Sequence, residues 1–156
     1  MSADIQVVPI EKTSTAGNPN AGTPFSFPSS HGPVKWIQAC WNGEVIKGLA
    51  IKFHGDDPQR MYTVGDWNNT HKGYHTSFVD LRADDLLSTL KIFTSLFGHV
   101  SVRGMHMETR LTHWSPGNVT DTSILDVKDR AWMGIFGTVN PDKFINSLGF
   151  WVTAKK

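Results

Sequence analysis

Three short segments of this chain align with one another without gaps, and this repeat constrains the fold more than any other feature. They are Ile46-Lys47-Gly48-Leu49-Ala50-Ile51, Val102-Arg103-Gly104-Met105-His106-Met107 and Ile145-Asn146-Ser147-Leu148-Gly149-Phe150. Each follows a second apolar run across a turn: Val34 to Trp41, Leu90 to Phe97, and Trp132 to Val139. Units of roughly 40 to 55 residues that repeat in this way are typical of modular architectures. The pattern predicts three similar hairpins around an approximate threefold axis.

The rest of the sequence also favours strands over helices. From Val34 onward, apolar residues recur at period two in short runs that Gly, Asn, Asp and Pro separate. Six Trp and nine Phe accompany many Val and Ile residues, which are the side chains enriched in sheets. We predict one all-β domain over residues 1–156, with one short strand within 5–10, with residues 11–33 mostly loop, and with at most one helical turn within 83–90. The residues predicted to lie inside are Ile37, Leu49, Ile51, Leu90, Met105, Met107, Ile135, Leu148 and Phe150.

Composition excludes several functional classes. The net charge is +1 and no run of Lys or Arg exceeds two, so the basic stripe of a nucleic-acid-binding protein is missing. No run of apolar residues is long enough to span a membrane. Cys40 is the only cysteine, and the N-terminal sequence does not read as a signal peptide, which together predict a cytoplasmic location, with non-classical secretion left open. We interpret the glycosylation patterns at Asn68 and Asn118 as chance matches.

No motif for catalysis or for metal binding stands out. The sequence contains no Gly-x-Ser-x-Gly, no phosphate-binding loop, no His-Glu-x-x-His and no Cys-x-x-Cys. His54-Gly55-Asp56-Asp57 follows an apolar run and precedes a proline, as a turn does. Cys40 lies in an apolar run, where a buried, unreactive thiol is the expected state. We therefore predict a protein that is not an enzyme and that has no catalytic residues, metal site or cofactor.

The C-terminal hairpin resembles that of the jacalin-related lectins. In that family an apolar Gly-Phe-Phe-Gly run precedes a polar loop and an Asp-Ala-Ile-Gly-Val-Tyr strand. Here Trp132 to Gly137 and Ile145 to Val152 occupy these places. Further similar segments are Gly22-Thr23-Pro24-Phe25, Phe78-Val79-Asp80-Leu81, Met105 to Thr109 and Trp114-Ser115-Pro116-Gly117. The resemblance covers residues 22–152 and implies a β-prism I fold, in which three four-stranded Greek-key sheets surround an apolar axis.

The resemblance also implies a sugar site at one end of the prism. In the family, an N-terminal Gly loop and the last hairpin form it, with the aspartate of a Gly-x-x-x-Asp motif as the main acceptor. Asn146 stands in place of that aspartate, and Asp142 precedes it by four residues. Asp142 either takes over the role of the carboxylate or only serves the Asn-Pro-Asp turn, and a third reading is that the site has been lost. The site residues implied by the resemblance are Gly22, Trp114, Thr138, Val139, Asn140, Asp142 and Asn146.

Two tryptophans are candidates for stacking on a sugar ring, Trp114 in a loop similar to a family binding loop, and Trp67 in a polar loop. The resemblance implies a lectin that binds mannose- or galactose-type glycans without metal. Its partners would be glycans or glycoproteins, and copies could associate into a homo-oligomer. The alternative is a β-prism interaction module that binds a protein or membrane partner without sugar specificity.

Overall fold

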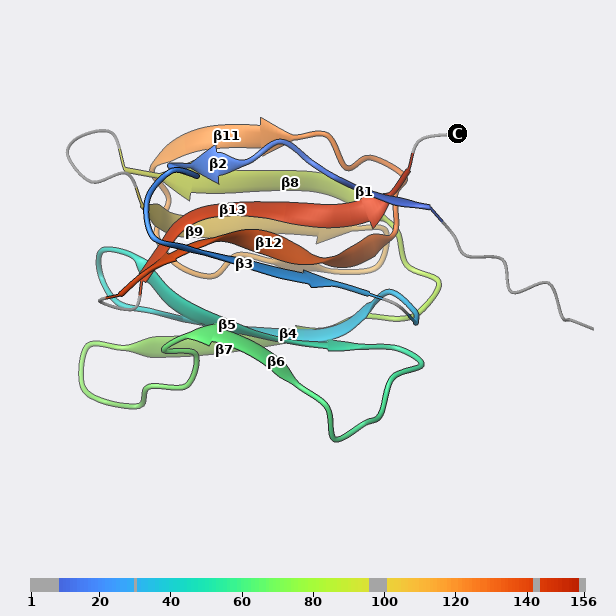
Figure 1. The fold of residues 1–156 in the computed structure, drawn as a ribbon, viewed down its shortest axis with the longest axis horizontal. Coiled ribbons are helices and arrows are strands. Elements are labelled where there is room, and N and C mark those ends of the chain that lie inside the picture. Colours follow the sequence, from blue (N-terminus) through green and yellow to red (C-terminus); the bar gives the residue numbers. More distant parts are fainter. Residues whose placement is uncertain (1–8, 30, 96–100, 142–143, 155–156) are drawn as a thin grey trace, which may run out of the picture.

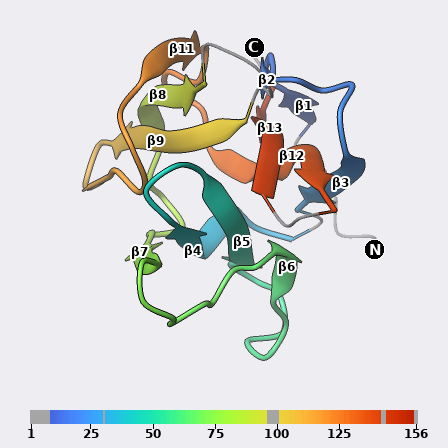
Figure 2. The ribbon, with the colours of Figure 1, turned by 90° about the vertical axis from the view of Figure 1, so that its left-hand side faces the viewer.

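The structure, a computed structural model, describes residues 9–29, 31–95, 101–141 and 144–154. Three antiparallel sheets surround one core, and the view along the long axis shows them as the sides of a triangle (Figures 1 and 2). The described residues contain strands, turns and loops and no helix. The all-β, threefold architecture predicted from the hairpin repeat is therefore confirmed, and it is a β-prism.

Each sheet is built around one of the three predicted hairpins. The first sheet has the order β6-β5-β4-β7: Tyr62–Gly65, Ile46–Phe53, Val34–Trp41 and His75–Asp80. The second has the order β10-β9-β8-β11: His113–Trp114, Val102–Thr109, Leu87–Thr94 and Asp121–Leu125. The third has the order β1-β13-β12-β3, with β2 also beside β13: Ile10–Lys12, Phe144–Thr153, Trp132–Asn140, Thr23–Pro28 and Ala16–Gly17.

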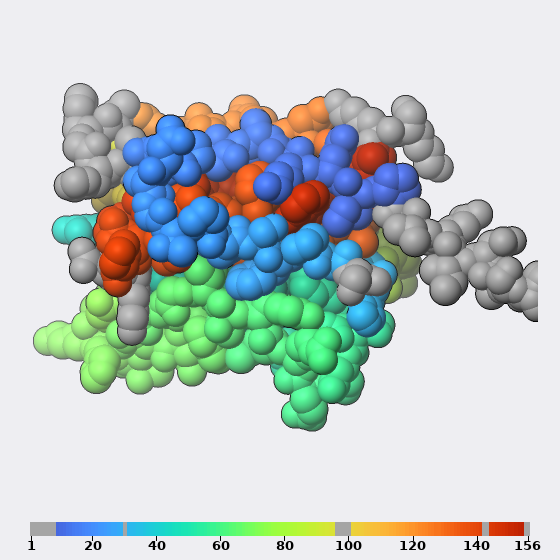
Figure 3. Space-filling view, in the orientation of Figure 1, coloured from blue at the N-terminus to red at the C-terminus, as the bar shows by residue number. Residues whose placement is uncertain are grey.

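The third sheet combines both ends of the chain. Its edge position next to β13 is divided between β1 and β2. Thr13 bridges the gap, since its N–H donates to the Phe150 carbonyl at 2.9 Å and its Oγ1 accepts from the Phe150 N–H at 3.0 Å. The range 11–33, predicted as mostly loop, thus also contains β2 and the six-residue strand β3. The space-filling view shows this N-terminal segment, in blue, lying over the red strands β12 and β13 (Figure 3).

The sequence allowed at most one helical turn within 83–90, and none forms, because Leu87 to Thr94 is strand β8. A β-bulge lies between Leu87 and Thr89. The bulge inserts one residue, so Leu87 and Leu90 both point inward although they are three positions apart, which is also the spacing of a helix face. Their exposed fractions are 2% and 0%.

The core lies where the three sheets meet. All nine residues predicted to be inside have an exposed fraction of 0%. Leu49, Met105 and Leu148, which share one position of the repeat, belong to one apolar cluster. In such a close-packed interior a change of one methylene group alters stability, so we expect these positions to tolerate little change in side-chain size.

Cys40 lies in β4 and is fully buried. Burial raises the pKa of its thiol, and the loop after β6 covers it, with Sγ 3.8 Å from the Asn69 carbonyl. We expect Cys40 to react with a thiol reagent at least about a hundredfold more slowly in the native protein than in denaturant, because the sheet must open first. Spectrophotometric titration of the thiol measures both rates. Equal rates would contradict the packing of β4.

Candidate functional site

Several loops meet at one end of the prism, on the left in Figure 1. We call it the turn end, and it comprises residues 18–22, 42–45, 66–74, 115–120 and 140–141. The opposite end carries the turns that start after β5, β7, β9 and β11. The resemblance to the lectins implies a sugar site at the end where segment 18–22 meets the β12–β13 hairpin.

Gly22 packs directly against the last hairpin. It has φ +81°, and a Cβ added to it would lie 2.5 Å from the Val139 carbonyl oxygen and 2.6 Å from Asn146 Oδ1. Neither distance leaves room for a side chain, so the close approach requires glycine. The structure thus brings together three of the residues expected at the site, Gly22, Val139 and Asn146.

Thr138 and Asn146 lie beneath the surface rather than on it. The Thr138 hydroxyl is 2.7 Å from Ser147 Oγ and donates to the Asn18 carbonyl at 3.3 Å. The Asn146 carbonyl accepts from the Asn18 N–H at 3.0 Å. The exposed fractions of Thr138 and Asn146 are 5% and 2%. Both residues therefore hold segment 18–22 on the hairpin, and the Asn146 amide is not presented to solvent as the family's aspartate would be.

Trp114 does not lie beside this site. It is the second residue of β10, opposite Met107 in the middle of β9, and its exposed fraction is 5%. Its Nε1 donates to Ser77 Oγ of the first sheet at 2.9 Å. The expectation that Trp114 stacks on a sugar is wrong for this structure, because the indole fills the space between two sheets.

Trp67 belongs to another unit and is half-buried. Its carbonyl accepts from Gln38 Nε2 at 3.3 Å, and the following Asn68 Oδ1 accepts from the same group at 3.3 Å. The loop is thereby tied to the outer face of β4. Asp142, the candidate carboxylate, lies outside the described residues.

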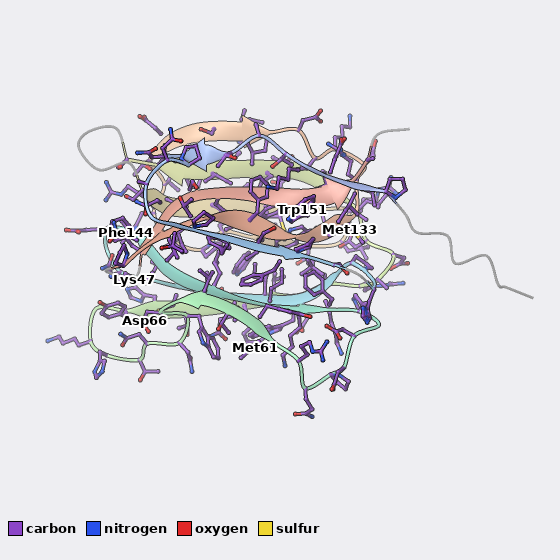
Figure 4. All side chains as sticks on the ribbon, in the orientation of Figure 1. Lys47, Met61, Asp66, Met133, Phe144 and Trp151 are labelled. Atoms are coloured by element: carbon purple, nitrogen blue, oxygen red, sulfur yellow. The ribbon has the colours of Figure 1, made fainter. Side chains whose placement is uncertain are left out.

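Phe144 is a site residue that the sequence analysis missed. It begins β13, pairs with Asn140 and is half-buried. Figure 4 shows it at the turn end, where the hairpin emerges. An aromatic ring that is partly exposed beside amide and backbone groups can cover the apolar face of a pyranose. The signal in the sequence was an aromatic residue two positions before Asn146, inside the polar loop.

A second missed feature is a Gly-Asx pair that occurs once in each sheet. Gly17, Gly65 and Gly117 have φ values of +94°, +69° and +88°. The N–H of the residue that follows each of them donates to the carbonyl of Asn146, Lys47 or Arg103, at 3.0, 2.9 and 3.0 Å. These three acceptors share one position of the hairpin repeat. We call this backbone arrangement the Gly-Asx cradle. It occurs three times at the turn end, and the acceptor residue carries a different side chain in each.

Metal and membrane features do not appear in the part of the chain that the structure describes. No three His, Cys, Asp or Glu side chains are grouped so that they could hold a metal ion. No described helix is long and apolar enough to cross a membrane. The candidate site consists instead of backbone groups, an amide and an aromatic ring.

Solved structures share this architecture over nearly their whole length. Malaysian banana lectin matches with a TM-score of 0.73 at 15% identity, over 94% of this chain and 99% of that one. Calsepa lectin, solved in complex with a bisected glycan, matches with a TM-score of 0.72 at 16% identity, over 92% and 97%. The fold is that of the jacalin-related lectins. A mannose-binding jacalin-related lectin from Ananas comosus also matches, with a TM-score of 0.72 at 13% identity, over 94% and 99%. No protein-family model and no curated sequence matches this chain.

The jacalin-related fold accounts for the order of the units. The N-terminal strands complete the sheet of the C-terminal hairpin, so the Gly22 loop and the last hairpin are neighbours although more than a hundred residues separate them. That closure is a property of the fold. The chemistry at the turn end is particular to this chain, because an amide stands where the family's motif has a carboxylate.

Proposed function

We propose that this protein is a lectin that binds mannose- or galactose-type glycans, without metal, where the Gly22 loop meets the β12–β13 hairpin. The observation that carries the proposal is the packing of Gly22 against Val139 and Asn146, next to the half-exposed ring of Phe144. The structural neighbours support it, since their names describe lectins, one of them mannose-binding. The role is binding rather than catalysis.

Each group at the proposed site has a different task. The Phe144 ring packs against the apolar face of the sugar, and Asn140 and the backbone of residues 18–22 surround its hydroxyls. Asp142 supplies the carboxylate that accepts from two adjacent hydroxyls, a charge-assisted arrangement stronger than bonds between neutral groups. Asn146 and Thr138 hold the Gly22 loop in place from below. Single-site affinity is weak for such a shallow surface, and several copies would raise it by avidity.

A glycan array with the purified protein tests the proposal. We expect binding to glycans that end in mannose or galactose and equal binding after treatment with a chelator. Loss of binding on chelation would contradict the metal-free site. No binding to any neutral glycan would overturn the proposed site at the Gly22 loop, and no binding to any glycan at all would favour the interaction module.

Asp142→Asn should weaken glycan binding about tenfold to hundredfold. Removing one charged partner of a hydrogen bond costs about 1.5–3 kcal/mol, and each 1.4 kcal/mol is about a factor of ten. Isothermal titration with the best array glycan measures the change. Asp121→Asn, which removes an exposed carboxylate in β11, is the matched control and should bind like the parent. Unchanged affinity in Asp142→Asn would show that this carboxylate does not contact the sugar.

The alternative function has one observation in its favour. The outer face of the first sheet carries Phe78, which is 57% exposed, with its ring centroid 6.3 Å from that of Trp36. Lys52 Nζ lies 5.3 Å from the Trp36 ring centroid. Aromatic side chains beside a cation are typical of protein interfaces. Phe78→Ala would weaken such an interface and leave glycan binding unchanged, which separates the two functions.

A further inference from the structure

A second hollow lies at the turn end, away from Gly22. It is an open cavity of about 240 Å³ between the β4–β5 turn and the adjoining ends of β8 and β9. The residues that line it are Glu44, Val45, Ser95, Ser101 and Arg103. The volume is below the range of about 300–1,000 Å³ that suits drug-sized ligands, so the cavity is matched to a single sugar unit.

Hydrogen bonds fix both walls of the cavity. On one side, Asn42 Oδ1 accepts from the N–H groups of Glu44 and Val45 at 2.8 and 2.9 Å. On the other side, the Ser95 N–H donates to the Ser101 carbonyl and the Ser101 N–H donates to Ser95 Oγ, both at 3.1 Å. These hydrogen bonds orient the described residues that border the cavity on its two sides.

Arg103 is held at the boundary between these walls. Its Nε donates to the Glu44 carbonyl oxygen at 2.7 Å, which orients the plane of the guanidinium group. Within the described ranges no carboxylate lies within ion-pair distance of Arg103, and its two terminal nitrogens have no protein acceptor. A half-buried guanidinium keeps its charge. An anionic ligand is the group that would satisfy it.

Glu44 supplies a hydrogen-bond acceptor beside the cation of Arg103. Its side chain is exposed at the rim, and in the described part of the chain no cation lies within ion-pair distance of its carboxylate. An exposed carboxylate accepts from adjacent hydroxyls. The cavity thus presents a planar cation for a carboxylate and an acceptor for hydroxyls, a combination that fits a sugar carrying an acid group.

Arg103 and Asn146 occupy equivalent positions of the fold but carry different chemical groups. Arg103 occupies in its hairpin the place that Asn146 occupies in the last one, and both carbonyls accept from a Gly-Asx N–H. Asn118, the Asx residue here, also donates through Nδ2 to the Asn42 carbonyl at 3.0 Å and so joins the two turns. A common backbone arrangement therefore carries an amide in one unit and a cation in another.

We infer that the Glu44–Arg103 cavity binds an acidic sugar unit of a glycan, a uronic or sialic acid. The carboxylate of the sugar lies on the Arg103 guanidinium and its hydroxyls face Glu44. The inference rests on the proposed lectin function and extends it with a second, chemically distinct site. A glycan with both a neutral and an acidic branch would then contact the turn end at two places.

The test compares two probes that differ in one group. Methyl β-D-glucuronide carries a carboxylate where methyl β-D-glucoside carries a hydroxymethyl group. We titrate each into the full chain and follow backbone amide shifts by NMR. The glucuronide should shift the amides of Val45, Ser101 and Arg103, with an affinity at least about tenfold above that of the glucoside, and this advantage should shrink as salt rises.

Variants locate the binding. Arg103→Gln should weaken glucuronide binding about tenfold to hundredfold. Arg103→Lys keeps the charge but loses the planar pair of N–H donors, so its affinity should lie between those of Arg103→Gln and the parent. Glu44→Gln keeps the backbone carbonyl that anchors Arg103 and should weaken both probes at this cavity. Arg82→Gln is the matched control, because Arg82 pairs with Asp84 at the opposite end, and it should bind like the parent.

Several results would overturn the inference while the proposed function stands. One is equal affinity for the two probes. Another is a set of glucuronide shifts around Gly22 and Asn140 instead of Arg103. A third is unchanged glucuronide binding in both Arg103 variants. The converse is also distinguishable, since binding of the glucuronide at Arg103 together with no neutral glycan on the array would remove the first site and retain this one.

Discussion

Leu148→Ala is expected to lower the free energy of unfolding by about 2–5 kcal/mol, a large share of the stability of a small domain. Leu148 has an exposed fraction of 0% and lies opposite Gly137 of β12 and Ala16 of β2. Neither neighbour has a side chain that could move into the space left behind, so a cavity remains. Chemical denaturation followed by tryptophan fluorescence measures the change.

Leu111→Ala is the matched control for this prediction. The same side chain is removed from a position that is 58% exposed, and the expected change is within about 0.5 kcal/mol. If the two variants unfold at the same denaturant concentration, the placement of β13 against the axis of the prism is wrong. Leu49→Ala, at the equivalent position of the first hairpin, should behave like Leu148→Ala.

Gly65→Ala should destabilise the protein by more than about 2 kcal/mol, through two separate effects. The residue has φ +69°, a region that costs an alanine about 1–2 kcal/mol. The added Cβ would also lie 2.3 Å from the Lys47 carbonyl oxygen, so β6 must separate from β5 to admit it. Gly65 touches neither proposed sugar site, and unfolding of this variant therefore reports on the fold alone.

Two further glycines separate these effects. Gly73 has φ +93° but nothing within 4 Å of an added Cβ, so Gly73→Ala should cost only the conformational part, about 1–2 kcal/mol. Gly43 has neither a positive φ nor a neighbour within that distance, and Gly43→Ala should change stability by less than about 0.5 kcal/mol. Thermal unfolding of the three variants gives the order. A Gly65→Ala protein as stable as Gly43→Ala would contradict the Gly-Asx cradle.

The hairpin repeat predicted most of the fold, because the pattern of apolar residues that reveals it lies within short stretches of sequence. Alternation of apolar residues sets which side chains of a strand face the core, and the nine predicted core residues follow from it. Paired strands that a short turn connects are neighbours in sequence, so the pairing of β4 with β5 and of β12 with β13 could be predicted. Within 83–90 the sequence left one helical turn open, because a bulge at Leu87 to Thr89 interrupts the alternation of the strand.

The sequence predicted which segments form the candidate site, but not what each residue does there. The resemblance placed Gly22 beside the last hairpin, and the structure brings Gly22, Val139 and Asn146 together. It could not show that Asn146 is covered, since burial depends on how closely segment 18–22 approaches. The same limit applied to Trp114, because a tryptophan two residues before a proline looks like an exposed loop residue in the sequence.

By itself, the sequence determined the strands, the threefold repeat and the inward faces, because these depend on spacing along the chain. Only the tertiary structure decided which side chains the turn end presents. Phe144 stays half-exposed and Trp114 is buried through contacts between segments far apart in sequence. The cavity beside Arg103 likewise exists only because the β4–β5 turn and β9 come from different units. Long-range packing is cooperative, so its outcome at one residue depends on the whole core and not on the neighbouring letters.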